Sequence, residues 1–171
     1  MKAIKIILAI ITFLVVAFLV TGLLVKETSY TTEVTVNKPL NEVFEIFNDL
    51  SKKKNWIKDL KSVEIVNENP DKTGSTYILV VNNRGTEVTM TEKVLAYVPN
   101  EKVTLFFDAQ NMLKTDEYTF SEKDGISTIK KNSSCRSDSY IMSCIFPYFK
   151  GTFQEIDQTY LNNFKAYLEQ E

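Results

Sequence analysis

The sequence predicts an α+β domain in which a curved antiparallel sheet of about seven strands surrounds a long C-terminal helix, with one membrane-spanning helix in front. Three observations support this fold class. The chain of 171 residues is 44% apolar, yet 20 of its apolar residues lie within the first 25 positions. Alternating segments joined by turn signals then fill most of the chain, and the C-terminus carries apolar residues at helical spacing.

The N-terminal segment is long enough to cross a bilayer. Residues 6–25 contain no charged side chain, and a helix of that length spans about 30 Å, the hydrocarbon thickness of a membrane. A cleaved signal peptide is the alternative, but its apolar region is usually about 7–15 residues long and ends in small residues. We therefore expect an uncleaved anchor with a short linker over residues 1–29, and one domain over residues 30–171.

The charges that flank this segment predict its orientation. Lys2, Lys5 and the amino terminus precede it, whereas Lys26 is followed at once by Glu27. The positive-inside rule places such an N-terminus in the cytoplasm. We expect a single-pass membrane protein whose domain lies on the extracytoplasmic side.

The domain begins with a strand and two helical pieces. Residues 30–36 alternate as a half-buried strand does. Pro39 suits the first turn of a helix, whose apolar stripe continues to Leu50. A short helical piece over residues 51–57 follows. The lysines at positions 52–54 are interpreted as a solvated face, with contact to anionic lipid headgroups as the alternative.

The remaining segments predict six strands and a closing helix. The strands cover residues 63–66, 75–82, 86–98, 102–108, 113–122 and 126–135, with turn signals at 82–85 and 123–125. Pro147 either starts the final helix or kinks a longer one that begins near Ser139. The sheet can curl around this helix and bury its single aromatic-rich face. That face consists of Phe149, Phe153, Ile156, Tyr160, Phe164 and Leu168.

Composition excludes several classes of chemistry. The chain has no histidine, which rules out Ser-His-Asp triads, HExxH zinc sites and two-histidine iron sites. Cys135 and Cys144 are the only two cysteines, so we expect no metal site. The sequence contains no glycine-rich phosphate loop, so we expect no cofactor. We expect two buried free thiols, with a disulfide as the alternative.

Residues 30–171 carry four more acidic than basic residues, so nucleic acid is not an expected partner. The sequence does not indicate whether the chain is a monomer or an oligomer.

Several segments resemble the SRPBCC superfamily, which includes START lipid-transfer domains and proteins described as polyketide cyclase/dehydrase. Residues 34–39 and 44–49, followed by Asn55 and Trp56, resemble its opening segment. Residues 74–77 and 84–98 are similar to the middle strands of its bacterial members, and residues 149–164 to its closing helix. The resemblance implies a helix-grip fold with a deep apolar cavity between sheet and helix. The expected membrane anchor makes this chain a bacterial membrane-anchored member and departs from the simplest soluble members. The resemblance implies no shared catalytic set, because relatives bind lipids, sterols or polyketides and only a few catalyse cyclisation.

Apolar and aromatic side chains that should face inward are the candidate ligand site, because ligand pockets are mostly apolar with few polar groups. The segment 146–153 and Trp56 would form the mouth of the cavity. The alternative is that these side chains simply fill the core. The candidates are Tyr77, Leu79, Met90, Phe107, Tyr118, Met142, Phe146, Phe149 and Phe153.

Two acidic residues are weak catalytic candidates. Glu92 shares the apolar parity of its strand, and Asp116 shares that of Tyr118. A carboxyl group in an apolar pocket would have a raised pKa and would suit a general acid or base. The alternative is a bulge or strand end that turns each acid to water.

The leading hypothesis is a non-enzymatic, membrane-tethered domain that binds a small apolar or lipid-like ligand in its cavity. The first alternative is a cyclase/dehydrase-type enzyme that uses Glu92, Asp116 or a cavity tyrosine. The second is a structural accessory module whose sheet binds another membrane protein. A filled cavity and an apolar patch on the convex face would favour this second alternative.

Overall fold

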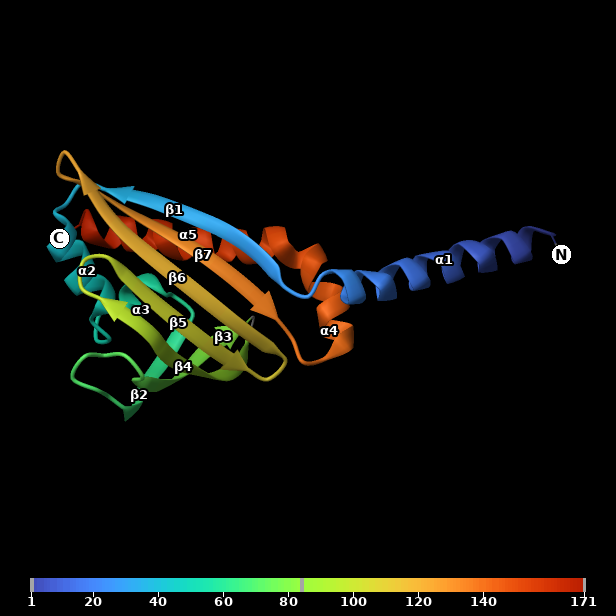
Figure 1. Cartoon of the computed structure of the whole chain (residues 1–171), viewed down its shortest axis with the longest axis horizontal. Helices are drawn as coiled ribbons and strands as arrows, with labels where there is room; N and C mark the ends of the chain where they lie inside the picture. Colours follow the sequence, from blue (N-terminus) through green and yellow to red (C-terminus); the bar gives the residue numbers. More distant parts are fainter. Residues whose placement is uncertain (1, 84, 171) are drawn as a thin grey trace.

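The computed structural model describes residues 2–83 and 85–170, which form a long N-terminal helix, a sheet and a C-terminal helical segment (Figure 1). The helices and strands lie close to the residue ranges predicted from the sequence. Arg84, in the first predicted hairpin turn, lies outside the described residues. In chain order the elements are α1 (Lys2–Leu24), β1 (Thr28–Val36), α2 (Leu40–Asn48), α3 (Lys53–Trp56), β2 (Leu60–Asn67), β3 (Thr76–Asn83), β4 (Thr86–Val98), β5 (Lys102–Ala109), β6 (Met112–Lys123), β7 (Ile126–Arg136), α4 (Tyr140–Ile145), the 3-10 turn η1 (Phe146–Phe149) and α5 (Lys150–Leu168).

The sheet of the described chain has seven strands in the order β1-β7-β6-β5-β4-β3-β2. Strands β2 to β7 form an antiparallel meander, and β1 pairs antiparallel with β7. At the turn between β6 and β7, Gly125 has a φ of 77°, which glycine adopts without steric cost. The prediction of about seven antiparallel strands is confirmed.

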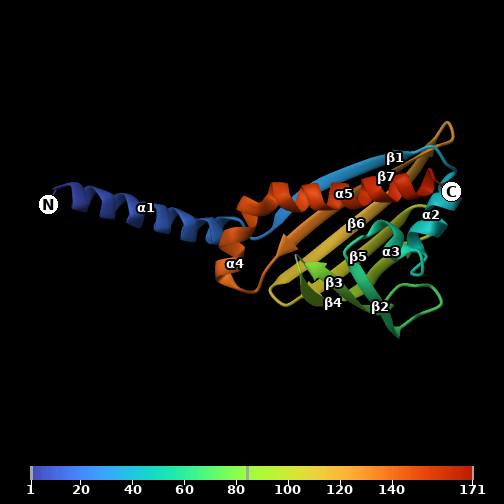
Figure 2. The ribbon, with the colours of Figure 1, turned by 180° about the vertical axis from the view of Figure 1, so that it is seen from behind.

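Helix α5 lies against the curved sheet and shares its core with the two short helices (Figures 1 and 2). Phe164 of α5 is fully buried, and its ring meets those of Phe47 in α2 and Trp56 in α3 at centroid distances of 5.5 and 5.1 Å. Such edge-to-face aromatic contacts add to the stabilisation from apolar burial. The sheet therefore grips the C-terminal helix, which is the helix-grip fold that the resemblance implies.

The outer edge of β1 is covered by two glutamines of α5. The side chain of Gln158 accepts a hydrogen bond from the backbone N–H of Glu33 and donates one to its carbonyl, at 3.3 and 2.9 Å. Gln154 donates to the carbonyl of Thr31. Exposed edges of this kind pair readily with other chains, so these side chains both join helix to sheet and block that edge.

The buried face of α5 differs from the predicted aromatic face in its N-terminal half. Asp157, Leu161, Phe164 and Leu168 are the buried residues of this helix. Ile156, which the apolar pattern placed inward, is 44% exposed. The pattern was wrong here because Asp157 occupies an inward position, and a periodicity based on apolar residues assigns a carboxylate to the surface.

Pro147 does not start the last helix but interrupts a longer helical segment. Ser139 precedes α4, and Pro147 lies in η1, which separates α4 from α5. A proline inside a helix removes a backbone donor and bends the chain. This bend lets α4 turn away from the sheet and lie beside the end of α1 (Figure 2).

We expect the Phe164→Ala variant to lose about 3–5 kcal/mol of unfolding free energy, because it removes a large buried ring. Ile156→Ala on the same helix is the control and should lose about 1 kcal/mol or less, because its side chain is half exposed. Denaturant unfolding of the full chain in detergent micelles, followed by the fluorescence of Trp56, measures both. Equal losses would show that α5 does not pack as described.

Candidate functional site

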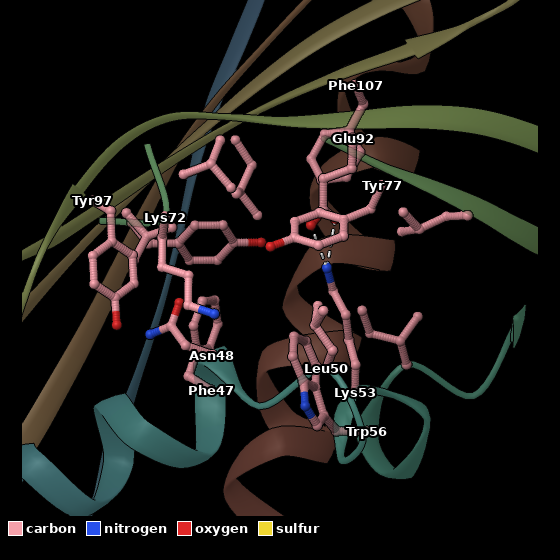
Figure 3. Close-up of a pocket in the computed structure, with 16 residues that line it drawn as sticks. Phe47, Asn48, Leu50, Lys53, Trp56, Lys72, Tyr77, Glu92, Tyr97 and Phe107 are labelled. Atoms are coloured by element: carbon pink, nitrogen blue, oxygen red, sulfur yellow. Dashed lines mark hydrogen bonds and ion pairs between the residues drawn. The ribbon is translucent and has the colours of Figure 1, made fainter. Parts of the chain in front are cut away.

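A cavity of about 80 Å³ lies between the α2–α3 segment and strands β3 to β6 (Figure 3). Most of its lining is apolar, contributed by Phe47, Leu50, Trp56, Ile57, Leu79, Val94, Val103, Leu105 and Phe107. The polar lining residues are Asn48, Lys53, Lys72, Tyr77, Glu92, Tyr97 and Tyr118.

A buried ion pair crosses this cavity. Lys53 of α3 reaches toward Glu92 of β4, and its Nζ lies 2.7 Å from Oε1 and 2.5 Å from Oε2 (Figure 3). Glu92 is 2% exposed and Lys53 is also buried. A buried charge is costly without a partner, so each of the two residues depends on the other. The pair also joins the short helix α3 to the middle of the sheet.

Two tyrosines place hydroxyl groups in the same cavity. Tyr77 is the direct neighbour of Glu92 across β3 and β4, and Tyr118 comes from β6. Burial raises the pKa of Tyr77, and it raises that of Tyr118 well above its ordinary value. Both hydroxyls therefore stay protonated at neutral pH and can donate a hydrogen bond to a bound molecule.

Four of the nine predicted cavity residues line this space, and five do not. Met90 is half-buried against the main core instead. A separate small core contains Phe146, with Met142 and Phe153 packed against it. Phe149 is about half exposed. The four that line the cavity are Tyr77, Leu79, Phe107 and Tyr118.

The predicted mouth is also misplaced. The segment 146–153 lies at the end of the domain that adjoins α1, whereas α2 and α3 lie at the opposite end (Figures 1 and 2). Trp56 is only 3% exposed, so it forms an inner wall of the cavity rather than its rim. Strand alternation identifies the inward face, but only the placement of α2 and α3 decides where along that face the cavity lies.

A second buried charge cluster lies between the sheet and α5. It contains Lys114 and Asp116 of β6, Lys131 of β7 and Asp157 of α5. Each lysine approaches both carboxylates, with Nζ to Oδ2 distances from 2.8 to 3.1 Å. The two positive and two negative formal charges therefore balance within the cluster.

Hydroxyl groups complete this cluster. Tyr30 donates to Asp157 at 2.8 Å, and Ser133 donates to Asp116 at 2.7 Å. Burial of Asp157 would raise its pKa, but the attraction of Lys131 and Lys114 outweighs burial and holds the pKa below its usual range. Burial also raises the pKa of the neighbouring Cys135 thiol to about 11, so this thiol is protonated and a poor nucleophile at neutral pH.

Glu92 and Asp116, the two candidate carboxylates, both face inward and are each 2% exposed. The alternative that a bulge turns them to water is therefore wrong. They belong to different sites, since Glu92 lines the cavity and Asp116 is fully engaged with Lys131, Lys114 and Ser133. Asp116 therefore has no access to a ligand in the cavity.

Sequence reasoning missed two of the charged residues that matter most. Lys53 lies in a run of lysines interpreted as solvated, yet it is the buried member of that run. Asp157 interrupts the apolar pattern of α5, and this interruption was the available signal. Cys135 and Cys144 are free and buried, as predicted. Within the described part of the chain, no group of three or more Cys, Asp or Glu side chains is arranged to hold a metal ion.

Comparison with known proteins identifies the family. The model of the family described as polyketide cyclase / dehydrase and lipid transport matches residues 27–137. The chain belongs to this family. It is an SRPBCC-type protein, as the sequence motifs suggested, and the family comprises ligand-binding and cyclase/dehydrase-type domains. No curated protein matches the chain in sequence.

Several solved structures share this fold. A START superfamily protein from Mycobacterium smegmatis is 13% identical, with a TM-score of 0.68, and 83% of this chain and 97% of that chain are covered. The di-domain ARO/CYC StfQ from the steffimycin biosynthetic pathway is 9% identical, with a TM-score of 0.69 and coverage of 84% and 52%. TTHA0849 from Thermus thermophilus is 14% identical, with a TM-score of 0.66 and coverage of 81% and 94%. At these identities the likeness concerns the fold alone.

We expect Asp157→Asn to cost about 3–5 kcal/mol of unfolding free energy, because it leaves two buried lysines with one carboxylate. Glu169→Gln, which breaks an exposed pair with Lys165 on the same helix, should cost about 1 kcal/mol or less.

The lowered pKa of Asp157 stabilises the fold above the ordinary aspartate pKa of about 3.9, and this stabilisation is lost as the pH falls below it. Denaturant midpoints between pH 7 and pH 3 should therefore fall less steeply in Asp157→Asn than in the unmodified protein.

Proposed function

We propose that the protein is a membrane-tethered binding domain that holds a small apolar or lipid-like ligand, bearing one polar group, in the cavity between α3 and the sheet. The observation that carries this proposal is the buried Lys53–Glu92 pair inside an enclosure that is mostly aromatic and aliphatic. Ligand sites typically combine apolar walls with a few placed polar groups. The aromatic walls would bury the apolar body, and the ion pair with Tyr77 would receive the polar group.

The charges of the lining favour an anionic polar group. Lys53 and Lys72 line the cavity together with a single carboxylate, Glu92. Lys72 lies in the loop between β2 and β3, is part-exposed and forms an ion pair with Glu68, so an arriving anionic group would exchange with the Glu68 carboxylate at this lysine. A carboxylate or similar head is therefore better matched to this lining than a cation is.

The volume limits the size of the ligand. A cavity of about 150 Å³ holds a molecule the size of benzene, and this cavity has about 80 Å³. Burial of a longer chain therefore requires the wall formed by α3 to move outward. That helix has four residues, and Lys53 and Trp56 are the members that contact the interior.

The tether is α1, which is long and apolar enough to cross a membrane by length and composition. Its packing against the domain supports an anchor over a removed signal. Gly22 is buried against α4, and a side-chain methyl group there would overlap the sulfur of Cys144. Removal of α1 would expose this contact. With Lys2 and Lys5 in the cytoplasm, the domain lies on the extracytoplasmic side.

A catalytic role is the second candidate, and Glu92 is the residue that favours it. Its carboxylate lines the cavity, Tyr77 is its neighbour across β3 and β4, and carboxylates and tyrosines both serve in proton transfer. Lys53 already engages both of its oxygens, so in this arrangement the carboxylate is not free to accept a proton from a substrate. Binding therefore fits the geometry better than cyclisation does.

We predict that decanoate, used as the probe, changes the fluorescence of Trp56 saturably when the full chain is in lipid nanodiscs. Trp56 is the single tryptophan of the chain and lines the cavity. Val94→Phe should weaken the apparent affinity at least tenfold, because the larger side chain fills the cavity. Val98→Phe, on the same strand but exposed and outside the lining, should leave it unchanged.

The ion pair is tested by the double variant Lys53→Met/Glu92→Gln, which removes both buried charges together and so leaves neither unpaired. It should bind decanoate more weakly than decanol, whereas the unmodified protein should prefer decanoate. A Trp56 fluorescence change that rises linearly with decanoate concentration would refute binding in this cavity. Equal apparent affinities in Val94→Phe and Val98→Phe would refute it as well.

We also predict that the protein isolated from carbonate-washed membranes retains α1, because α1 is an anchor. Intact mass spectrometry measures this directly. A soluble chain that begins after residue 22 would identify α1 as a cleaved signal.

A further inference from the structure

A cluster of exposed apolar and aromatic side chains covers the junction of α4 and η1. The side chains are between 41% and 64% exposed, although they are large and mostly hydrophobic. Contiguous exposed patches of this kind mark interaction sites. We call this cluster the α4 surface, and it consists of Tyr140, Ile141, Tyr148 and Phe149.

The α4 surface is continuous with the last turns of α1. The Tyr140 hydroxyl donates to the carbonyl oxygen of Leu19 at 2.5 Å, and the Tyr148 hydroxyl lies 3.0 Å from Oγ1 of Thr21. The Tyr148 ring also stacks on Phe18 at a centroid distance of 6.2 Å. Both figures show α4 beside this end of α1, while the rest of α1 projects away from the domain (Figures 1 and 2).

The position of these contacts along α1 sets the depth of α4. From Ile6, the first residue of the uncharged span, to Leu19 the helix rises about 20 Å, at about 1.5 Å per residue, through a hydrocarbon core of about 30 Å. Leu19 to Gly22 therefore lie within about 10 Å of the outer boundary between acyl chains and headgroups. Tyrosines concentrate at this boundary, where the ring is apolar and the hydroxyl is polar.

We propose that the α4 surface binds the lipid of the bilayer that α1 crosses, with Ile141, Tyr148 and Phe149 inserted at the boundary between headgroups and acyl chains. This inference rests on the membrane tether of the proposed function and adds a second, non-spanning contact with the membrane. Interfacial segments bury their apolar face about 5–10 Å into this region. Lys150, exposed directly after Phe149, lies at the level where anionic headgroups would meet it.

This contact fixes how the cavity faces the membrane. Helices α2 and α3, which form one wall of the cavity, lie at the end of the domain away from α1 and α4 (Figure 2). With both α1 and the α4 surface in the bilayer, the domain is held by two contacts at one end. The cavity is then held at the end of the domain that points away from the bilayer.

Tryptophan fluorescence in nanodiscs tests the inference, with brominated acyl chains as quenchers. The native Trp56 is buried in the core and remote from α1, so it provides the unquenched background. Ile141→Trp places a reporter on the α4 surface, and Tyr148→Trp provides a second one. Ile65→Trp on β2 is the matched control, because Ile65 is 54% exposed and Ile141 is 52% exposed.

We expect brominated lipid to quench the added signal of Ile141→Trp and Tyr148→Trp at least twofold, and that of Ile65→Trp not at all. Acrylamide in the aqueous phase should show the reverse order. If both α4 reporters escape the lipid quencher, the inference is overturned. Protection of these reporters from acrylamide as well would then assign the α4 surface to a protein contact, such as a second copy of the chain.

The outcome can be separated from a failure of the proposed function. Retention of the intact chain in carbonate-washed membranes establishes the α1 tether, and the decanoate response establishes the cavity. With both of these intact, unquenched α4 reporters would overturn only the lipid contact of α4.

Discussion

The burial of Asp157 on the inward face of α5 is the constraint on which much of the domain depends. A carboxylate in the interior is tolerated only beside compensating charges, and the described structure supplies them from Lys114 and Lys131. This requirement sets the rotation of α5 about its axis and its position along the sheet. The following turns of α5 then face the main core through Leu161, Phe164 and Leu168.

The same constraint separates the two ends of the domain. The charge cluster occupies the sheet beneath the N-terminal half of α5, and Tyr118 lies between it and the cavity, with Lys131 Nζ 5.1 Å from its ring. The cavity that contains the Lys53–Glu92 pair lies at the α2–α3 end of the domain. The other end is occupied by α4 and the last turns of α1 (Figures 1 and 2).

Local patterns predicted the strands, the short helices and the fold class, because alternation and turn residues are properties of neighbouring positions. The inward orientation of Tyr77, Leu79 and Glu92 also followed from strand parity. The role of Lys53 did not follow, because a lysine within a basic run has no local signal for burial. Its partner, Glu92, is 39 positions away, and only the folded sheet brings the two together.

The amino-acid sequence by itself determined the apolar N-terminal helix, the order of the strands and the absence of histidine chemistry. Each of these depends on composition or on short-range periodicity. Tertiary structure decided which side chains of α5 face inward, where the cavity lies, and that Glu92 rather than Asp116 lines it. These features depend on pairing between charges on different elements, and the cost of burying an unpaired charge is a property of the assembled core. The packing of α4 against α1 was decided in the same way, since it joins residues more than 100 positions apart.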